Sequence, residues 1–168
     1  MQSRILGIAL GIDRMTTDQD IQPALRELFA SQRFAVLATD DCGQPFASLM
    51  AFAVTSDLRE IVVLTDRHRR KFSNLKANCR VALLIDDREN KGSDTEKSVA
   101  VTAIGDANEV SGEADKELRK LFLVRHPNLA GFAATPTCTV VSVRISSYQL
   151  VSQFERIREW RPEDKAVN

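Results

Sequence analysis

The segment from Phe46 to Val54 constrains the fold most, because large and small side chains alternate along it. The alternating sets are Phe46, Ser48, Met50, Phe52 and Val54 on one face and Ala47, Leu49, Ala51 and Ala53 on the other. A period of two is typical of a β-strand. A strand whose other face is mostly small can lie close to a flat ligand or to another backbone. Asp, Gly and Pro residues at 39–45 predict a turn before this strand.

Other apolar runs predict five more strands joined by short connections, at 34–38, 61–64, 81–85, 99–110 and 139–151. Helical spacing of apolar residues predicts helices at 18–31, at 70–78 and from Ser111 to Pro127, with loops at 86–97 and 128–137. Short connections favour antiparallel pairing, and closure into a barrel removes exposed sheet edges. The expected fold class is therefore mainly β, a six-stranded antiparallel barrel with flanking α-helices.

Composition excludes several classes of function. The chain has 168 residues, of which 43% are hydrophobic and 27% charged, as in one folded domain. Its 23 basic and 23 acidic residues balance, which argues against a general nucleic-acid binder. Three widely spaced cysteines and two isolated histidines predict neither a disulfide framework nor a metal site. No apolar run is long enough to span a membrane, and we expect a cytoplasmic protein.

The two ends of the chain are expected to differ from its middle. The apolar run at 5–12 has the length of a secretory core, but Asp13 and Arg14 follow it and no small-residue cleavage site is present. We therefore expect an N-terminal arm at 1–16, one domain at 17–155 and a charged tail at 156–168.

A cluster of basic residues carries the strongest functional signal. Residues 59–80 contain seven cations and two anions, and the densest part, 67–71, lies where a strand ends and a helix begins. Cations at a helix N-terminus oppose the helix dipole, so this position favours a bound anion, with Thr65 as a further donor. The alternatives are a solvated cluster or pairing with the acidic loop at 86–96. A nucleic-acid patch is disfavoured because no aromatic residues interleave.

The order of these elements is similar to that of a known family. Thr65 is followed by Arg70-Lys71, by Asn74-Leu75 and then by the strand that starts at Arg80-Val81. This pattern resembles the pyridoxamine 5'-phosphate oxidase-like family of FMN-binding split β-barrels, over about residues 20–155. The resemblance implies a six-stranded split barrel that forms a homodimer, with FMN bound in clefts between the subunits.

The resemblance also implies roles for particular residues. The FMN phosphate would be held by Thr65, Arg70 and Lys71. The flavin ring would lie along Ser48, Leu49, Met50 and Ala51, with Val101 and Thr102 contributed by the partner subunit. No catalytic residue and no metal ligand is implied.

Departures from the family pattern concern the substrate. Ser48 and Ala53 stand where the true oxidases have Arg and Lys, and the C-terminal Arg-Leu-His-type segment is missing, which points away from pyridoxamine phosphate. The prediction is an FMN-dependent oxidoreductase acting on an unidentified small molecule. The alternatives are a non-catalytic flavin- or haem-binding module and a deazaflavin-dependent reductase. His68 is expected near the phosphate and His126 at a helix end. Trp160 is expected either over the partner's flavin or in ordinary packing.

Overall fold

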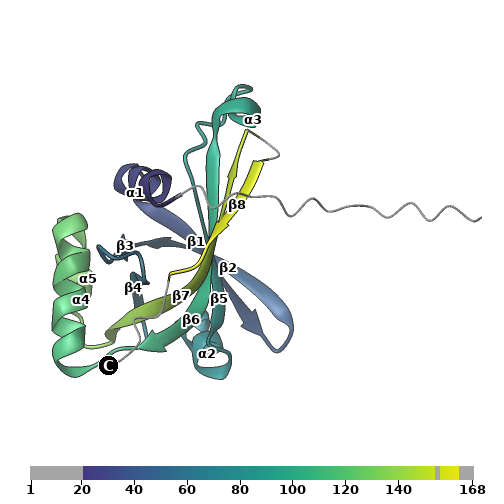
Figure 1. Cartoon of the computed structure of the whole chain (residues 1–168). Helices are drawn as coiled ribbons and strands as arrows, with labels where there is room; N and C mark the ends of the chain where they lie inside the picture. Colours follow the sequence, from purple (N-terminus) through teal and green to yellow (C-terminus); the bar gives the residue numbers. More distant parts are fainter. Residues whose placement is uncertain (1–20, 154–155, 163–168) are drawn as a thin grey trace, which may run out of the picture.

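The computed structural model describes residues 21–153 and 156–162 (Figure 1). The predicted arm at 1–16 and the end of the predicted tail at 163–168 lie outside the described residues. The described chain is an antiparallel sheet curled into a split β-barrel with helices around it, so the predicted fold class is confirmed. The strands are β1 (Phe34–Asp41), β2 (Gln44–Ala51), β3 (Ala53–Val54), β4 (Glu60–Asp66), β5 (Arg80–Asp86), β6 (Val99–Glu109), β7 (Cys138–Ser152) and β8 (Arg156–Trp160).

The segment that contains β2 and β3 closes the barrel, because it pairs with a different strand on each side of Phe52. The strand order is β2-β1-β5-β6-β7-β4-β3, with β8 paired to β7. β2 pairs with β1 and β3 pairs with β4, while Phe52 between them belongs to neither ladder. The single strand predicted at 46–54 is therefore divided at Phe52. This division, together with β8, makes eight strands instead of six.

The interior of the barrel is filled by side chains that alternate along each strand. Leu37, Leu83 and Val143 are at most 1% exposed. Helix α1 (Gln22–Ser31) buries Leu25, Leu28 and Phe29 against them. The ring of Phe29 meets the ring of Phe52 edge-on, with centroids 5.9 Å apart. Burial of this apolar surface drives the folding of the sheet.

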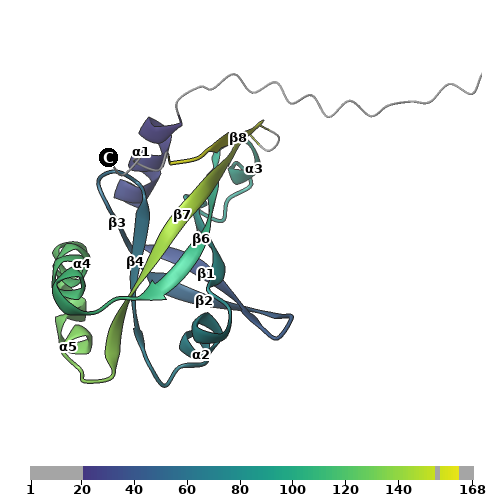
Figure 2. The same ribbon diagram turned by 60° about the horizontal axis from the view of Figure 1, so that its bottom comes forward.

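Further helices cover the outside and the ends of the barrel. Helices α4 (Gly112–Arg125), η1 (Pro127–Leu129) and α5 (Ala130–Ala133) pack on the outer face of β4 and β7, where Phe122 joins Val62, Leu64 and Val140 in a second apolar cluster (Figures 1 and 2). The loop predicted at 128–137 thus contains two short helices. Helix α2 (Arg70–Ala77) lies at one end of the barrel and α3 (Asp94–Lys97), within the predicted loop at 86–97, at the other.

The beginning of the predicted tail is part of the sheet. β8 pairs along β7, and Trp160 stacks on the buried ring of Tyr148 with centroids 5.9 Å apart. Trp160 thus has a packing role within its own chain, one of the two roles considered for it. In the described part of the chain, no helix combines the length and the apolar character needed to cross a bilayer.

We expect Gly105→Ala to destabilise the barrel strongly. The register of β6 and β7 shifts between Ile104 and Gly105, and a Cβ at Gly105 would lie 2.1 Å from the carbonyl oxygen of Arg144. Relieving that overlap requires backbone movement in a packed sheet, which costs about 3 kcal/mol or more. Urea denaturation measures the loss. Gly92→Ala, with nothing within 4 Å of its added Cβ, is the control, and equal stability of the two variants would contradict the prediction.

Candidate functional site

A pocket of about 400 Å³ lies between the end of β4, the end of β2 and the helices α4 to α5. It is lined by Phe34, Leu49, Met50, Ala51, Leu64, Thr65, Asp66, Arg69, Lys71, Phe122, Leu129 and Phe132. All polar side chains of the lining come from residues 65–71, so one end of the pocket is cationic and the rest is apolar. The structure brings five of the predicted residues together here: Leu49, Met50, Ala51, Thr65 and Lys71.

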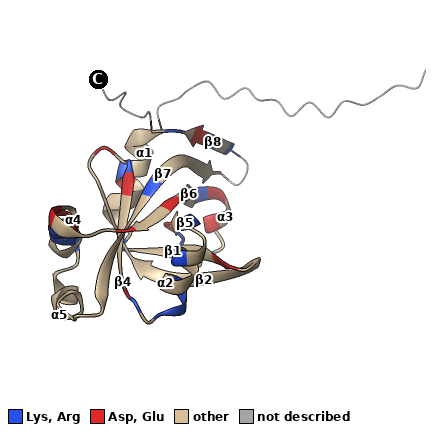
Figure 3. Cartoon of the chain, turned by 90° about the horizontal axis from the view of Figure 1, so that it is seen from below, with Lys and Arg blue, Asp and Glu red and all other residues tan. Residues whose placement is uncertain are grey.

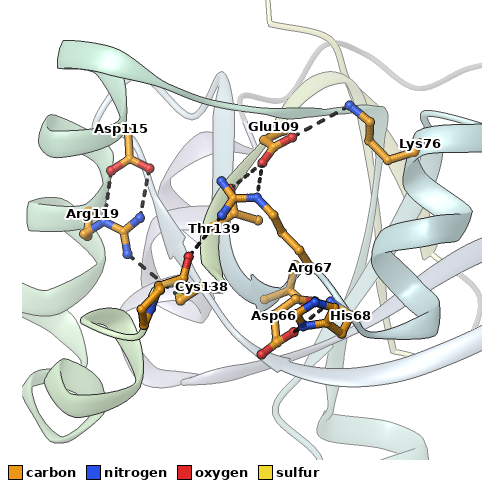
Figure 4. Close-up of polar contacts among 11 residues, drawn as sticks. Asp66, Arg67, His68, Lys76, Glu109, Asp115, Arg119, Cys138 and Thr139 are labelled. Carbon is orange, nitrogen blue, oxygen red and sulfur yellow. Dashed lines mark hydrogen bonds and ion pairs between the residues drawn. The ribbon is translucent and has the colours of Figure 1, made fainter.

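Basic residues gather between β4 and α2 (Figure 3), and Figure 4 shows the carboxylate partners of two of the five at 67–71. The Arg67 Nε donates to Glu109 at 2.7 Å, and this hydrogen bond is the main reason why the pKa of Glu109 is lowered. The Nδ1 of His68 lies 3.1 Å from an oxygen of Asp66. The hydroxyl of Thr137 also donates to Asp66 and contributes most to lowering the pKa of that carboxyl. These contacts tie the loop after β4 to β6 and to the chain before β7.

Arg70, predicted to hold a phosphate, is directed elsewhere. Its guanidinium donates to a carboxylate oxygen of Asp41 at 2.8 Å and lies over the ring of Phe46, 4.7 Å from the centroid. Arg69 lines the pocket in its place. Arg69 has extended backbone before the first turn of α2, and Arg70 is the first helical residue. Consecutive side chains at a helix start therefore diverge, which residue spacing alone does not reveal.

Arg69 and Lys71 are the two cations that remain at the pocket. Among the described residues, neither has a carboxylate at ion-pair distance, whereas Arg67, His68 and Arg70 each have one. The Lys71 ammonium lies 3.1 Å from the sulfur of Met50. Burial, and then the charge of Arg69, lower the pKa of Lys71. The first turn of α2 contains no acidic residue either. The one carboxylate of the pocket lining, Asp66, is bound by His68 and Thr137, so this end of the pocket carries an excess of positive charge.

Besides Arg70, three predicted site residues lie outside the pocket of their own chain. Ser48 is half-buried and pairs with Leu37 in the ladder of β1 and β2. Val101 is 0% exposed and packs inside the barrel, so only its backbone could reach a ligand held by another subunit. Thr102 lies on the outer face of the sheet beside Leu84. The role of Val101 and Thr102 across subunits stays a prediction.

Sequence reasoning missed Arg69 and the helical wall of the pocket. Phe122 was assigned to a buried helix stripe, and Leu129 and Phe132 fall in a segment whose pattern indicated only a loop. Both histidines also lie outside the lining. The side chain of His68 is 79% exposed beside Asp66, and His126 is buried at the end of α4, as its predicted place at a helix end requires.

Comparisons with known proteins agree with this fold. The family model described as pyridoxamine 5'-phosphate oxidase matches residues 21–152. A heme binding protein from Mycobacterium smegmatis is 20% identical, with a TM-score of 0.73 over 82% of this chain and 56% of that chain. HutZ, the heme storage protein from Vibrio cholerae, is 18% identical, with a TM-score of 0.68 over 79% of this chain and 94% of its own.

A third solved structure is that of a FAD-binding protein from Mesorhizobium loti. It is 16% identical, with a TM-score of 0.62 over 77% of this chain and 90% of that chain. The present chain spans little more than half the length of the mycobacterial protein. No curated protein matches the sequence. At these identities, the solved structures show a shared fold.

We expect Lys71→Gln to leave the ligand-free protein as stable as the wild type, or more stable. The lowered pKa means that folding disfavours the charged ammonium, so its contribution to stability is unfavourable at every pH at which Lys71 is protonated. Arg67→Gln is the contrasting variant, because it removes the ion pair with Glu109 and should cost roughly 0.5–1 kcal/mol. Thermal unfolding at pH 7 measures both variants. A lower melting temperature for Lys71→Gln than for Arg67→Gln would show that Lys71 stabilises the folded protein, contrary to the prediction.

Proposed function

The chain belongs to the pyridoxamine 5'-phosphate oxidase family, and we propose that it is an FMN-binding oxidoreductase that acts on a small molecule as a homodimer. One observation carries this proposal. Arg69 and Lys71 face the same pocket as Thr65 without a carboxylate partner among the described residues. Unpaired cations beside a helix start and a hydroxyl group suit a phosphate dianion.

The pocket fits FMN in its chemistry and in its size. A phosphate would be held at the cationic end by Thr65, Arg69 and Lys71. Apart from Asp66, which is already bound by His68 and Thr137, the remaining lining is apolar, with Met50 and Phe122 buried, and suits the planar ring. A volume of about 400 Å³ is within the range usual for cofactor sites. Bound FMN would supply hydride or single-electron chemistry, while the protein would orient it and exclude water.

An apolar outer sheet face supports a second copy of the chain as the partner. Leu49, Val36 and Leu84 are consecutive neighbours across β2, β1 and β5, and Ile104 lies one strand further on. Leu49 is 68% exposed and Leu84 37%. Phe34, 57% exposed, lines the pocket together with Leu49, so this face is continuous with the pocket. A partner seated on this face would cover the pocket and bring its own Thr102 to the same interface.

Haem is the alternative ligand that two of the similar structures suggest by their names. Both histidines of the chain are described, and neither lines the pocket. The Nε2 of His126 is engaged with the carbonyl of Phe52, and His68 is paired with Asp66. The pocket therefore offers no imidazole to a haem iron. FMN agrees better with its lining than haem does.

We expect the purified protein to bind FMN, and Arg69→Gln and Lys71→Gln each to weaken that binding about tenfold or more. Each variant removes one charge-assisted hydrogen bond to the phosphate. Arg70→Gln is the matched control, because Arg70 is already paired with Asp41. Quenching of flavin fluorescence measures the affinity. Riboflavin, which lacks the phosphate, should bind the wild type, Arg69→Gln and Lys71→Gln with the same affinity.

Four results would count against this assignment. Failure of the wild type to bind FMN would refute the proposal that the protein is a flavoprotein. Tighter binding of a deazaflavin would favour the reductase alternative. A larger loss of FMN affinity for Arg70→Gln than for Arg69→Gln would show that Arg70 holds the phosphate, as predicted from the sequence. If FMN binds but the bound flavin is neither reduced by NAD(P)H nor reoxidised by any acceptor, the protein is a non-catalytic flavin module.

We expect Leu84→Asp to dissociate the homodimer and to weaken FMN binding at the same time. A carboxylate in the middle of an apolar interface would be buried without a partner. Val124→Asp is the matched control, because Val124 is 77% exposed on α4 and away from this face. Sedimentation velocity measures the state of assembly. A wild type that sediments as a monomer, or a dimeric Leu84→Asp variant, would contradict the proposed interface.

A further inference from the structure

We propose that His126 is a positioning residue of the cofactor pocket, which holds the strand wall and the helical wall at a fixed separation. This inference rests on the proposed function only in its choice of ligand. It starts from the carbonyl group of Phe52, where the closing strand leaves one sheet edge and joins the other. The Nε2 of His126 lies 2.8 Å from that carbonyl oxygen, in a buried contact between residues 74 positions apart. Phe52 directly precedes β3 and His126 directly follows α4, and both of these elements are labelled in Figure 1.

The carbonyl of Phe52 needs a donor from outside the sheet. Phe52 belongs to neither the ladder of β2 nor that of β3, and its side chain is 0% exposed. A buried carbonyl without a donor is costly. Since a carbonyl oxygen can only accept, Nε2 of His126 must be the donor. His126 itself is 3% exposed. The bond is therefore shielded from competing water.

Both groups joined by this bond are adjacent to the pocket. Met50 and Ala51, directly before Phe52, line the strand side of the pocket, and Phe122, one helical turn before His126, lines the helix side. The rings of His126 and Phe122 are in contact, with centroids 4.7 Å apart. The carbonyl of His126 also accepts the N–H of Leu129, another lining residue. His126 thus connects the strand wall to two side chains of the helical wall.

The neighbouring residue strengthens this junction from the same helix end. The guanidinium of Arg125 lies over the ring of Phe52, 5.5 Å from its centroid, and donates to the carbonyls of Phe29 and Gln32 at the end of α1. Arg33 in turn donates to the carbonyl of Arg125 at 2.9 Å. The ends of α1 and α4 therefore meet at Phe52, where the chain passes from β2 to β3. His126 is the member of this junction whose ring also touches a lining residue of the pocket.

The test compares His126→Phe, His126→Gln and Tyr148→Phe. The phenylalanine keeps a ring against Phe122 and loses the donor, whereas glutamine keeps a donor and loses the ring. Tyr148→Phe is the matched control, because its hydroxyl makes the same kind of buried bond, 2.8 Å to the carbonyl of Leu58, at residues that do not line the pocket. FMN affinity, the visible absorbance bands of the bound flavin and amide hydrogen exchange are measured on the full chain.

We expect His126→Phe to weaken FMN binding about tenfold, to shift the flavin bands and to speed exchange at residues 49–54. Glutamine should restore most of the affinity. Tyr148→Phe should lower stability and speed exchange near residues 55–60 without changing the affinity or the bands. If His126→Phe does not fold, His126→Asn, whose shorter side chain cannot reach the carbonyl, takes its place.

Unchanged exchange at 49–54 in His126→Phe would overturn the inference, and so would equal effects of His126→Phe and Tyr148→Phe on FMN affinity. If the wild type fails to bind FMN, the proposed function fails. The exchange measurement, which needs no ligand, still decides whether His126 holds the strand wall.

Discussion

The architecture depends on one constraint, which is that a single stretch of chain must satisfy both free edges of the sheet. β2 pairs with β1 and β3 pairs with β4, so the chain has to turn at Phe52. The turn interrupts the ladders at a buried position, where His126 bonds the carbonyl and Arg125 covers the ring. Met50 and Ala51, which precede the turn, reach the end of β4, where Thr65 lies. The pocket is thus a consequence of how the barrel closes.

The basic residues near the pocket fall into two groups, those with a carboxylate partner and those without one, and the net charge of the chain does not reveal this difference. Five consecutive basic residues follow β4, but three of them have carboxylate partners, and these contacts hold the loop and the start of α2 in place. The two unpaired cations, Arg69 and Lys71, stand on either side of the paired Arg70. Holding Arg69 and Lys71 together without a counter-charge costs stability, and the paired residues around them maintain the geometry. This arrangement supports the proposal that the loop binds a ligand that brings its own negative charge.

The sequence allowed some of this site to be predicted, for physical reasons. Thr65 and the basic segment 67–71 were identified because the end of a strand and the start of a helix are readable from periodicity, and a helix start attracts anions. The family resemblance then selected Lys71 within that segment. The choice between Arg69 and Arg70 was not readable, because it depends on the backbone angle at which α2 begins. The kink at Phe52 was also hidden, since the alternation of large and small residues continues through it. Leu129 and Phe132 carry no periodic pattern.

The same closure explains why the pocket of one chain is open on one side. Phe34 and Leu49 line the pocket and remain more than half exposed, at the margin of an apolar sheet face that reaches Leu84 and Ile104. Exposed apolar residues scattered singly are ordinary, but apolar residues on neighbouring strands of one sheet face, here β2, β1 and β5, support the proposal that a partner covers this face. A ligand with an anionic end and a flat apolar end would neutralise Arg69 and Lys71 and cover part of this face. Cofactor binding and subunit association would then stabilise each other, because each removes from water the apolar surface that the other leaves exposed.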